Sequence, residues 1–238
     1  MHRLEILKRL NTLPFPVFTV ADAARVIGEK RENVYVYLAR MKKSGLIYEI
    51  EKGKYTTTKD PFQIATSLAH PSYISFLSGM SLYGMTDQIP AKIQVVTTRQ
   101  KKSVVFQDME VQFIRFRKSR VFGFKKIKRG EFEIFLAEPE KTIIDSLYLP
   151  KYAPVSESFS ALLEGELDEE KLLRYAKKMD SKVVSKRLGY LLDLCGSDYR
   201  EKLEISPKME HLNPSKKKKG KQNKKWKLII NEVLESAQ

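Results

Sequence analysis

The residues best suited to chemistry lie in one stretch, AEPEKTIIDSLYLPKY, at residues 137–152. It places Glu138, Glu140 and Lys141 directly after a β-like run, EFEIFLA. Two carboxylates and a lysine behind a strand are typical of magnesium-dependent nucleases, whose acidic side chains converge on the metal from neighbouring strands. In that class the lysine-containing motif is Glu-x-Lys within a strand. The spacing here is Glu-Pro-Glu-Lys at the end of a strand.

The same residues also fit the start of an ordinary helix. Pro139 suits the first helical position, and the helix dipole favours carboxylates in the first turn. An apolar stripe follows at helical spacing, starting at Ile143. We therefore predict a helix without a catalytic residue, in a protein that is not an enzyme. The alternative that stays open is a metal-dependent DNA-acting enzyme that uses Glu138, Glu140 and Lys141.

Other catalytic and cofactor signatures are missing from the sequence. It contains neither a G-x-x-x-x-G-K-[ST] phosphate loop nor a G-x-S-x-G nucleophile elbow. One cysteine and three scattered histidines give no metal-ligand spacing. We expect no cofactor and no bound metal.

The composition is that of a globular protein. Of 238 residues, 42% are hydrophobic and 31% charged, and the length allows one large domain or two small ones. The apolar runs fall short of the roughly 20 residues that a membrane-spanning helix needs. The opening MHRLEILKRLN lacks the apolar core of a secretory signal. The sequence therefore predicts a cytoplasmic protein without a membrane partner.

The formal net charge of +15 is concentrated in three places. Residues 1–57 carry a net charge of +5, and residues 115–129 hold 8 basic residues and no acidic one. Residues 206–227 carry a net charge of +8. Concentrated positive charge indicates a polyanionic partner, most often nucleic acid, although some of these lysines could form a solvated face.

The first fifth of the chain predicts three short helices followed by a β-hairpin. Leucines recur at helical spacing in LEILKRLN. Thr19 and Asp22 form a capping-box pattern at the start of a second helix, which Gly28 ends. A third helix, ENVYVYLARMKKSG, stops at Gly45. Two alternating runs then surround Gly53, as in a hairpin.

This order of elements is that of a winged helix-turn-helix, which we place at residues 1–58. If Val34, Leu38 and Met41 face the core, the other side of the third helix can enter a DNA major groove, where Asn pairs with adenine and Arg with guanine. Winged helices also serve as protein-binding modules, and that alternative stays open. The residues predicted to contact DNA are Arg31, Asn33, Tyr35, Arg40 and Lys43, with Lys52 and Lys54 at the hairpin tip.

Residues 59–238 predict a second, mixed α/β domain. Asp60 followed by Pro61 opens a helix. Three amphipathic helices are expected in SESFSALLEG, DEEKLLRYAKKM and SKVVSKRLGYLLDLCG, and KWKLIINEV is expected to close the chain as a strand. The Lys-rich segment 215–225 suits non-specific attraction to phosphate, and Trp226 is expected to pack in a core. Candidate strands of an antiparallel or mixed sheet are residues 92–98, 104–106, 110–116, 121–127 and 131–137.

Four motifs, in register behind the winged helix, resemble the AbiEi antitoxin family. They are SGMSLYGMTDQIP, AEPEKTIIDSLYLPKY, KRLGYLLDLCG and KWKLIINE, and the likeness runs from about residue 5 to residue 233. The resemblance implies an α+β fold with a winged helix followed by an antitoxin domain. It implies that the helix and hairpin residues named above are the ones that contact DNA. The central motifs contain Tyr83, Asp87 and Gln88, and Glu140, Lys141 and Asp145, for which it implies a role in holding the second domain together.

The resemblance also implies a biological role. Similar proteins belong to abortive-infection loci, where they are the antitoxin of a type IV system whose toxin is nucleotidyltransferase-like. They repress their own operon by binding inverted repeats in its promoter, and they need not form a stable complex with the toxin. We therefore expect double-stranded DNA as the direct partner and such a toxin as the functional partner. A stand-alone winged-helix transcription factor is the alternative.

Overall fold

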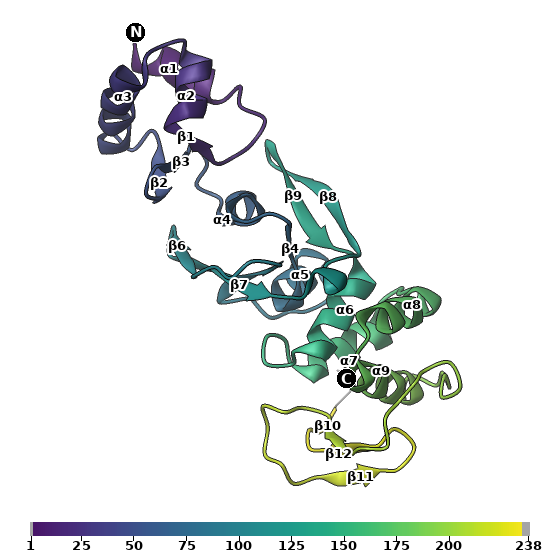
Figure 1. Cartoon of the computed structure of the whole chain (residues 1–238). Helices are drawn as coiled ribbons and strands as arrows, with labels where there is room; N and C mark the ends of the chain where they lie inside the picture. Colours follow the sequence, from purple (N-terminus) through teal and green to yellow (C-terminus); the bar gives the residue numbers. More distant parts are fainter. Residues whose placement is uncertain (1, 235–238) are drawn as a thin grey trace. The chain divides into compact units, whose positions relative to one another are not determined.

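The chain has a mixed α+β fold, as predicted, in a computed structural model that describes residues 2–234 (Figure 1). The helices are α1 (Arg3–Leu10), α2 (Val20–Ile27), α3 (Arg31–Lys43), α4 (Pro61–Ala65), α5 (Phe76–Leu82), α6 (Pro139–Tyr148), α7 (Val155–Glu164), α8 (Glu169–Met179) and α9 (Lys182–Leu194), with 3-10 turns η1 (Thr66–Leu68) and η2 (Lys118–Arg120). The strands are β1 (Phe18–Thr19), β2 (Tyr48–Glu51), β3 (Lys54–Thr56), β4 (Ser72–Ile74), β5 (Lys92–Thr97), β6 (Val104–Phe106), β7 (Met109–Arg115), β8 (Phe124–Arg129), β9 (Phe132–Ala137), β10 (Glu210–His211), β11 (Lys221–Asn223) and β12 (Leu228–Ile230).

The described residues form three β-sheets, with strand orders β1-β3-β2, β6-β7-β5-β4-β9-β8 and β10-β12-β11. In the largest sheet, β5 and β7 run parallel over six residue pairs, while β6 is antiparallel to β7. The prediction of an antiparallel or mixed sheet is therefore confirmed as mixed. Within the part of the chain that the structure describes, no helix is both long and apolar enough to cross a membrane.

The chain divides into two compact units that interleave in sequence. Unit 1 comprises Met1–Tyr73, Ala91–Phe116 and Lys126–Phe135. Unit 2 comprises Ile74–Pro90, Arg117–Lys125 and Leu136–Gln238. The units cut across the predicted boundary at residue 58, so the division into domains 1–58 and 59–238 stays a prediction.

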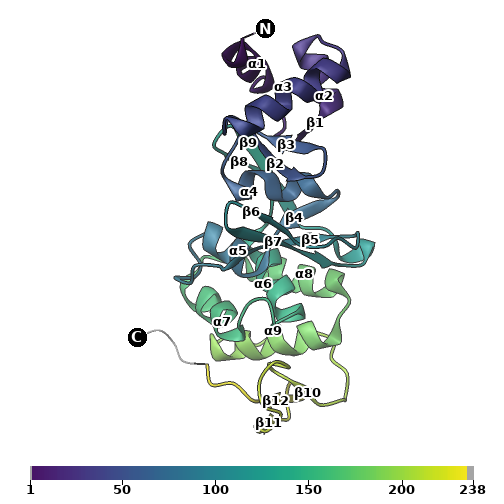
Figure 2. The same cartoon turned by 90° about the vertical axis from the view of Figure 1, so that its left-hand side faces the viewer.

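The N-terminal part of unit 1 is built from α1, α2 and α3 around one apolar core (Figure 2). The capping box at α2 is present: Asp22 N–H donates to Thr19 Oγ1 over 3.3 Å, and Thr19 N–H donates to Asp22 Oδ2 over 2.9 Å. Gly28 ends the helix in the left-handed region, at φ 77°. These local contacts confirm the helix boundaries expected from the sequence.

A second apolar cluster of unit 1 joins the β2–β3 hairpin to α4 and β6. Ile50, Ile64 and Phe106 are among its buried members. The Tyr48 and Phe106 rings meet edge to face, with centroids 6.1 Å apart. The hairpin is therefore supported by packing on a neighbouring element as well as by its own hydrogen bonds.

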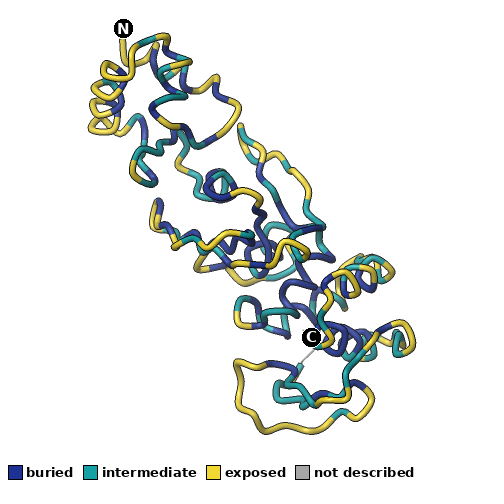
Figure 3. Tube along the Cα trace, in the orientation of Figure 1, coloured by how far each residue is buried: buried dark blue, intermediate teal, exposed yellow. Residues whose placement is uncertain are grey.

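Unit 2 is organised around α6, which is buried along nearly its whole length. Residues 140–147 of α6 are all buried, including charged ones (Figure 3). Helices α5, α7, α8 and α9 all pack against α6. A helix covered on every side needs partners within the protein for its polar groups. For Glu140, Lys141 and Asp145 these partners are described below.

Two strand predictions were wrong in their boundaries. Residues 121–127 were expected to be a strand, but β8 begins only at Phe124, because Gly123 adopts φ 65° and interrupts the extended chain. A Cβ at Gly123 would meet the Tyr175 ring at 3.0 Å, so this turn needs glycine. The closing strand is also shorter than KWKLIINEV, because Trp226 and Lys227 form a turn before β12.

Trp226 is completely buried, which confirms the prediction that it packs in a core. Its ring lies against Gly189 of α9, where a Cβ would meet ring carbons at 2.2 Å. Its indole Nε1–H donates to Asp193 Oδ2 over 2.7 Å. Trp226, seated on a glycine, is thus one of the contacts that anchor the sheet β10-β12-β11 to α9, beside Arg187 of α9, whose Nη2 donates to His211 O over 3.0 Å.

Candidate nucleic-acid interface

Helix α3 has a buried side and an exposed side, as its sequence predicts. Val34, Leu38 and Met41 are at most 1% exposed and belong to the N-terminal core. On the opposite side, Tyr35 and Val36 expose 58% and 46% of their surface. The exposed side therefore combines apolar and polar groups, as a helix that contacts both base edges and phosphates requires.

Four of the predicted DNA-contacting residues present free positive charge. Arg31, Arg40, Lys43 and Lys52 are exposed. Among the described residues, none of the four forms an ion pair or a side-chain hydrogen bond. Three of them lie on α3 and one at the hairpin tip. Cations without a protein partner attract anions more strongly than cations already neutralised by a carboxylate.

Two other predicted contacts are engaged within the protein. Asn33 Nδ2 donates to Glu29 Oε2 over 3.1 Å. Lys54 is half-buried, and its ammonium lies 2.8 Å from Glu51 Oε2. Both side chains would have to exchange these partners in order to contact DNA, so their assignment as contacts stays a prediction.

A carboxylate fixes the hairpin tip against the last turn of α3. Glu49 accepts a hydrogen bond from Gly53 N–H over 3.2 Å and one from Lys42 Nζ over 2.5 Å. The hydrogen bond from Lys42 is the main reason that the pKa of Glu49 lies below its ordinary value. Gly53 adopts φ 76°, as the tight turn requires. This contact fixes the hairpin bearing Lys52 to the end of α3 that bears Lys43.

The acidic motif of the opening stretch is part of an internal network in unit 2. Glu138 occupies the N-cap position of α6, and its carboxylate accepts a hydrogen bond from Tyr175 Oη. Lys171 Nζ lies 3.6 Å from Glu138 Oε1 and 2.9 Å from Glu140 Oε2. Burial, together with the hydrogen bond to Glu138, raises the pKa of Tyr175 to about 12. Burial, with the same two carboxylates nearby, also raises the pKa of Tyr83 to about 12.

Lys141 contacts a different carboxylate from the one that the nuclease hypothesis requires. Its ammonium pairs with Asp145, one helical turn further along α6, and both side chains have 0% exposure. Asp145 Oδ2 also accepts a hydrogen bond from Ser75 Oγ over 2.9 Å. Burial lowers the pKa of Lys141, and Asp145 opposes that effect. The structure thus brings Lys171 to the two glutamates, and it places Lys141 where a substrate does not reach.

The acidic network has no metal-binding geometry. Within residues 2–234, no group of three or more histidine, cysteine, aspartate or glutamate side chains is arranged to hold a metal ion. Sequence reasoning had missed Ser75, Lys171 and Tyr175, the partners that complete the network. No local signal could have identified them, because they lie 31 to 70 residues from the groups they contact.

The Lys-rich segment lies mainly in the loop between β10 and β11 and extends through β11. Lys216, Lys217, Lys218 and Lys219 are exposed, and no ion pair involves them among the described residues. The loop is held at its base by Asn231, whose Nδ2 donates to Lys217 O over 2.9 Å and to Asn213 O over 2.7 Å. The loop therefore presents a run of uncompensated positive charge from an anchored base.

Comparison with known proteins leaves the family open. No protein-family model matches this chain, and no curated protein matches it either. The support for a function therefore comes from the residues, the geometry and the resemblance of the four motifs.

Proposed function

We propose that this protein binds double-stranded DNA in a sequence-specific manner, with α1–α3 and the β2–β3 hairpin acting as a winged helix-turn-helix. The observation that carries the proposal is the exposed side of α3. It holds Arg31, Arg40 and Lys43, which form no ion pair with any residue that the structure describes, beside exposed Tyr35 and Val36. The other side of the same helix completes a core. A helix of this kind has the dimensions and the chemistry to enter a major groove.

The chemistry of each side chain suggests its role on DNA. Arg40 can donate two hydrogen bonds to guanine, and the methyl groups of Val36 can contact thymine. Arg31 lies in the first turn of α3, where the helix amides also favour phosphate. Lys52 at the hairpin tip can reach the backbone, and the lysines at 216–219 add sequence-independent attraction.

Arg40→Ala is expected to lower the affinity for the DNA upstream of this protein's own operon by roughly 5- to 150-fold, the equivalent of about 1–3 kcal/mol for one bidentate pairing of a side chain with a base. A mobility-shift titration against scrambled DNA of equal length measures this effect. Binding to scrambled DNA should fall much less. A variant with Lys216, Lys217, Lys218 and Lys219 changed to glutamine should weaken binding to both DNAs equally. It should also reduce the salt dependence, by about one unit of log-log slope for each phosphate that is no longer neutralised.

The control is Arg174→Ala, which removes an exposed arginine from α8 without touching α3. Substitution is preferable to deleting residues 215–225, because a deletion would remove strand β11. Equal affinity of the wild type for both DNAs, or an unchanged affinity after Arg40→Ala, would show that α3 does not read this promoter.

The resemblance to the AbiEi family supports the rest of the proposal. We propose that the DNA is a set of inverted repeats in the protein's own promoter, so that the protein is an autorepressor. We also propose that it is a type IV antitoxin, which counteracts a nucleotidyltransferase-like toxin. Unit 2, which contains the acidic motif and most of the predicted antitoxin domain at residues 59–238, would carry the antitoxin activity.

Growth measures the antitoxin activity directly. Expression of the toxin encoded beside this gene should arrest growth of a host, and co-expression of this protein should restore it. Arg40→Ala should still restore growth, because the antitoxin activity is placed in unit 2. A neighbouring gene that is not toxic, or a toxin that this protein does not counteract, would favour the stand-alone transcription factor.

A further inference from the structure

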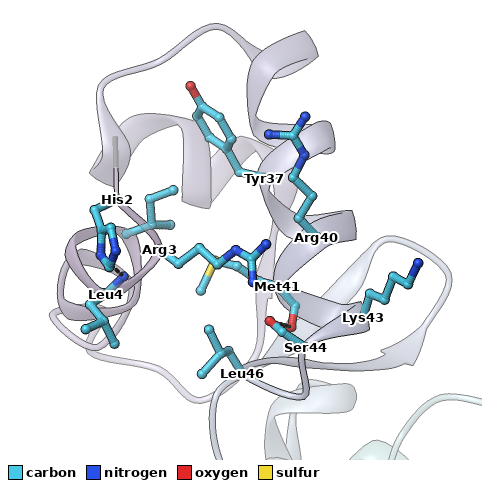
Figure 4. Close-up of a pocket in the computed structure, with 10 residues that line it drawn as sticks. His2, Arg3, Leu4, Tyr37, Arg40, Met41, Lys43, Ser44 and Leu46 are labelled. Carbon is cyan, nitrogen blue, oxygen red and sulfur yellow. Dashed lines mark hydrogen bonds between the residues drawn. The ribbon is translucent and has the colours of Figure 1, made fainter.

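A groove of about 900 Å³ lies between α1 and the C-terminal half of α3, entirely within unit 1 (Figure 4). The DNA-binding proposal accounts for only two of the ten residues that line it, Arg40 and Lys43. None of the ten is acidic, and three are permanently cationic. The residues that matter for its chemistry are Arg3, Leu4, Tyr37, Arg40, Lys43 and Leu46.

The groove combines apolar surface with a basic rim. Leu4, which is 57% exposed, is one of the residues that line the groove, and Tyr37 and Leu46 are half-buried. Arg3 extends from α1 toward α3 (Figure 4). Tyrosine and arginine are among the residue types enriched at protein interfaces. A phosphate group would satisfy the cations, but it has no apolar part with which to cover Leu4 and Leu46.

We propose that this groove binds an acidic segment of a partner protein, with an apolar side chain seated between Leu4 and Leu46 and carboxylates at Arg3 and Arg40. The charge of the rim favours a negatively charged partner, because the described lining residues include three cations and no carboxylate. Its volume is that of a binding pocket that takes several side chains. The apolar surface then selects a peptide segment over a simple anion.

The position of the groove has a regulatory consequence. Arg40 and Lys43 line the groove and also belong to the proposed DNA-binding side of α3. A segment bound there neutralises Arg40 and covers Lys43 at the end of the helix, so the acidic partner and DNA exclude each other. This consequence rests on the proposed function, whereas the binding of an acidic segment does not.

The experiment uses the full-length protein and fluorescein-labelled synthetic peptides that hold a central leucine flanked by aspartate and glutamate. Two companion peptides replace the leucine with serine, or the acidic residues with their amides. Fluorescence anisotropy should show binding of the acidic leucine peptide alone, weakened by added salt because ion pairs contribute. Leu4→Ser and Arg3→Gln should each weaken it by about tenfold, equivalent to about 1.4 kcal/mol.

Matched controls distinguish binding in the groove from non-specific electrostatic or hydrophobic binding elsewhere on the surface. Leu163→Ser removes a leucine that is 41% exposed on α7, and Arg174→Gln removes an exposed arginine on α8; neither should change peptide binding. Leu4→Ser should leave DNA affinity unchanged, and the peptide should displace DNA from the wild type but not from Leu4→Ser.

Three results would overturn the proposal. The first is that the wild type does not bind the peptide, or that Leu4→Ser and Arg3→Gln bind it as tightly as the wild type does. The second is a loss of DNA affinity in Leu4→Ser as large as the loss of peptide affinity, which would make the groove part of the DNA interface. The third is salt-sensitive self-association in sedimentation that Leu4→Ser abolishes, which would assign the groove to a second copy of this chain. If the protein binds the peptide but no DNA, the proposal for the groove is supported and the proposed DNA-binding function is contradicted.

Discussion

Asp145→Ala is expected to lower the free energy of unfolding by about 3–5 kcal/mol, the range for removing one partner of a buried ion pair. Lys141 and Asp145 both have 0% side-chain exposure. Without the carboxylate, the Lys141 ammonium stays charged in a poorly solvated interior or gives up its proton, and either outcome costs free energy. Ser75 also loses the acceptor of its hydroxyl hydrogen bond. Denaturant unfolding followed by circular dichroism measures the change.

Two further variants show whether burial is the cause. Glu133→Ala breaks the Lys126–Glu133 pair, whose side chains are 57% and 62% exposed, and should cost at most about 1 kcal/mol. The double variant Lys141→Met with Asp145→Leu should recover most of the stability, because an apolar pair needs no charged partner. A cost for Asp145→Ala no larger than that for Glu133→Ala would contradict the role we assign to this pair.

Gly189→Ala is expected to destabilise the protein by about 3 kcal/mol, at the upper end of the range for overpacking a core. Two effects oppose each other at this position. Alanine is favoured over glycine within a helix by about 1 kcal/mol. However, the added Cβ would lie 2.2 Å from two carbons of the fully buried Trp226 ring. The steric effect is larger, so the sheet β10-β12-β11 should detach from α9 before the rest of unit 2 unfolds.

The Trp226 ring also supplies the control. In Gly189→Ala with Trp226→Phe, the smaller ring frees the space that the methyl group needs, so part of the stability should return. The recovery is incomplete, because phenylalanine lacks the Nε1–H that donates to Asp193. Limited proteolysis of residues 207–234, together with denaturant unfolding, reports the detachment. A Gly189→Ala variant as stable as the wild type, as helix propensity alone predicts, would show that the ring moves aside at no cost.

The acidic motif illustrates why residue types alone are a weak guide to chemistry. Glu138, Glu140 and Lys141 suggest a nuclease by their identity, yet the helix prediction for the same residues is the one that the structure confirms. The ion pairs show the structural role of the motif, because Lys171 pairs with the two glutamates and Asp145 pairs with Lys141. That the protein has no catalytic activity stays a prediction.

The sequence by itself determined the features that depend on neighbours a few residues apart. The capping box at Thr19, the helix end at Gly28, the hairpin around Gly53 and the buried side of α3 were all predicted. Each depends on hydrogen bonds within one turn or on a repeat of 3.6 residues, which a short stretch of sequence contains in full. The same holds for the positive charge of α3 and the Lys-rich loop, since charge follows from residue type.

Only the tertiary structure decided which distant groups meet. Ser75 reaches Asp145, and Trp226 meets Gly189, through packing that joins segments 70 and 37 residues apart in sequence. The sequence also did not show that Arg3 of α1 faces Arg40 across a groove with an apolar surface. The physical reason is that side-chain partners in a core are selected by shape and by the need to satisfy every buried charge, and both depend on how complete elements pack.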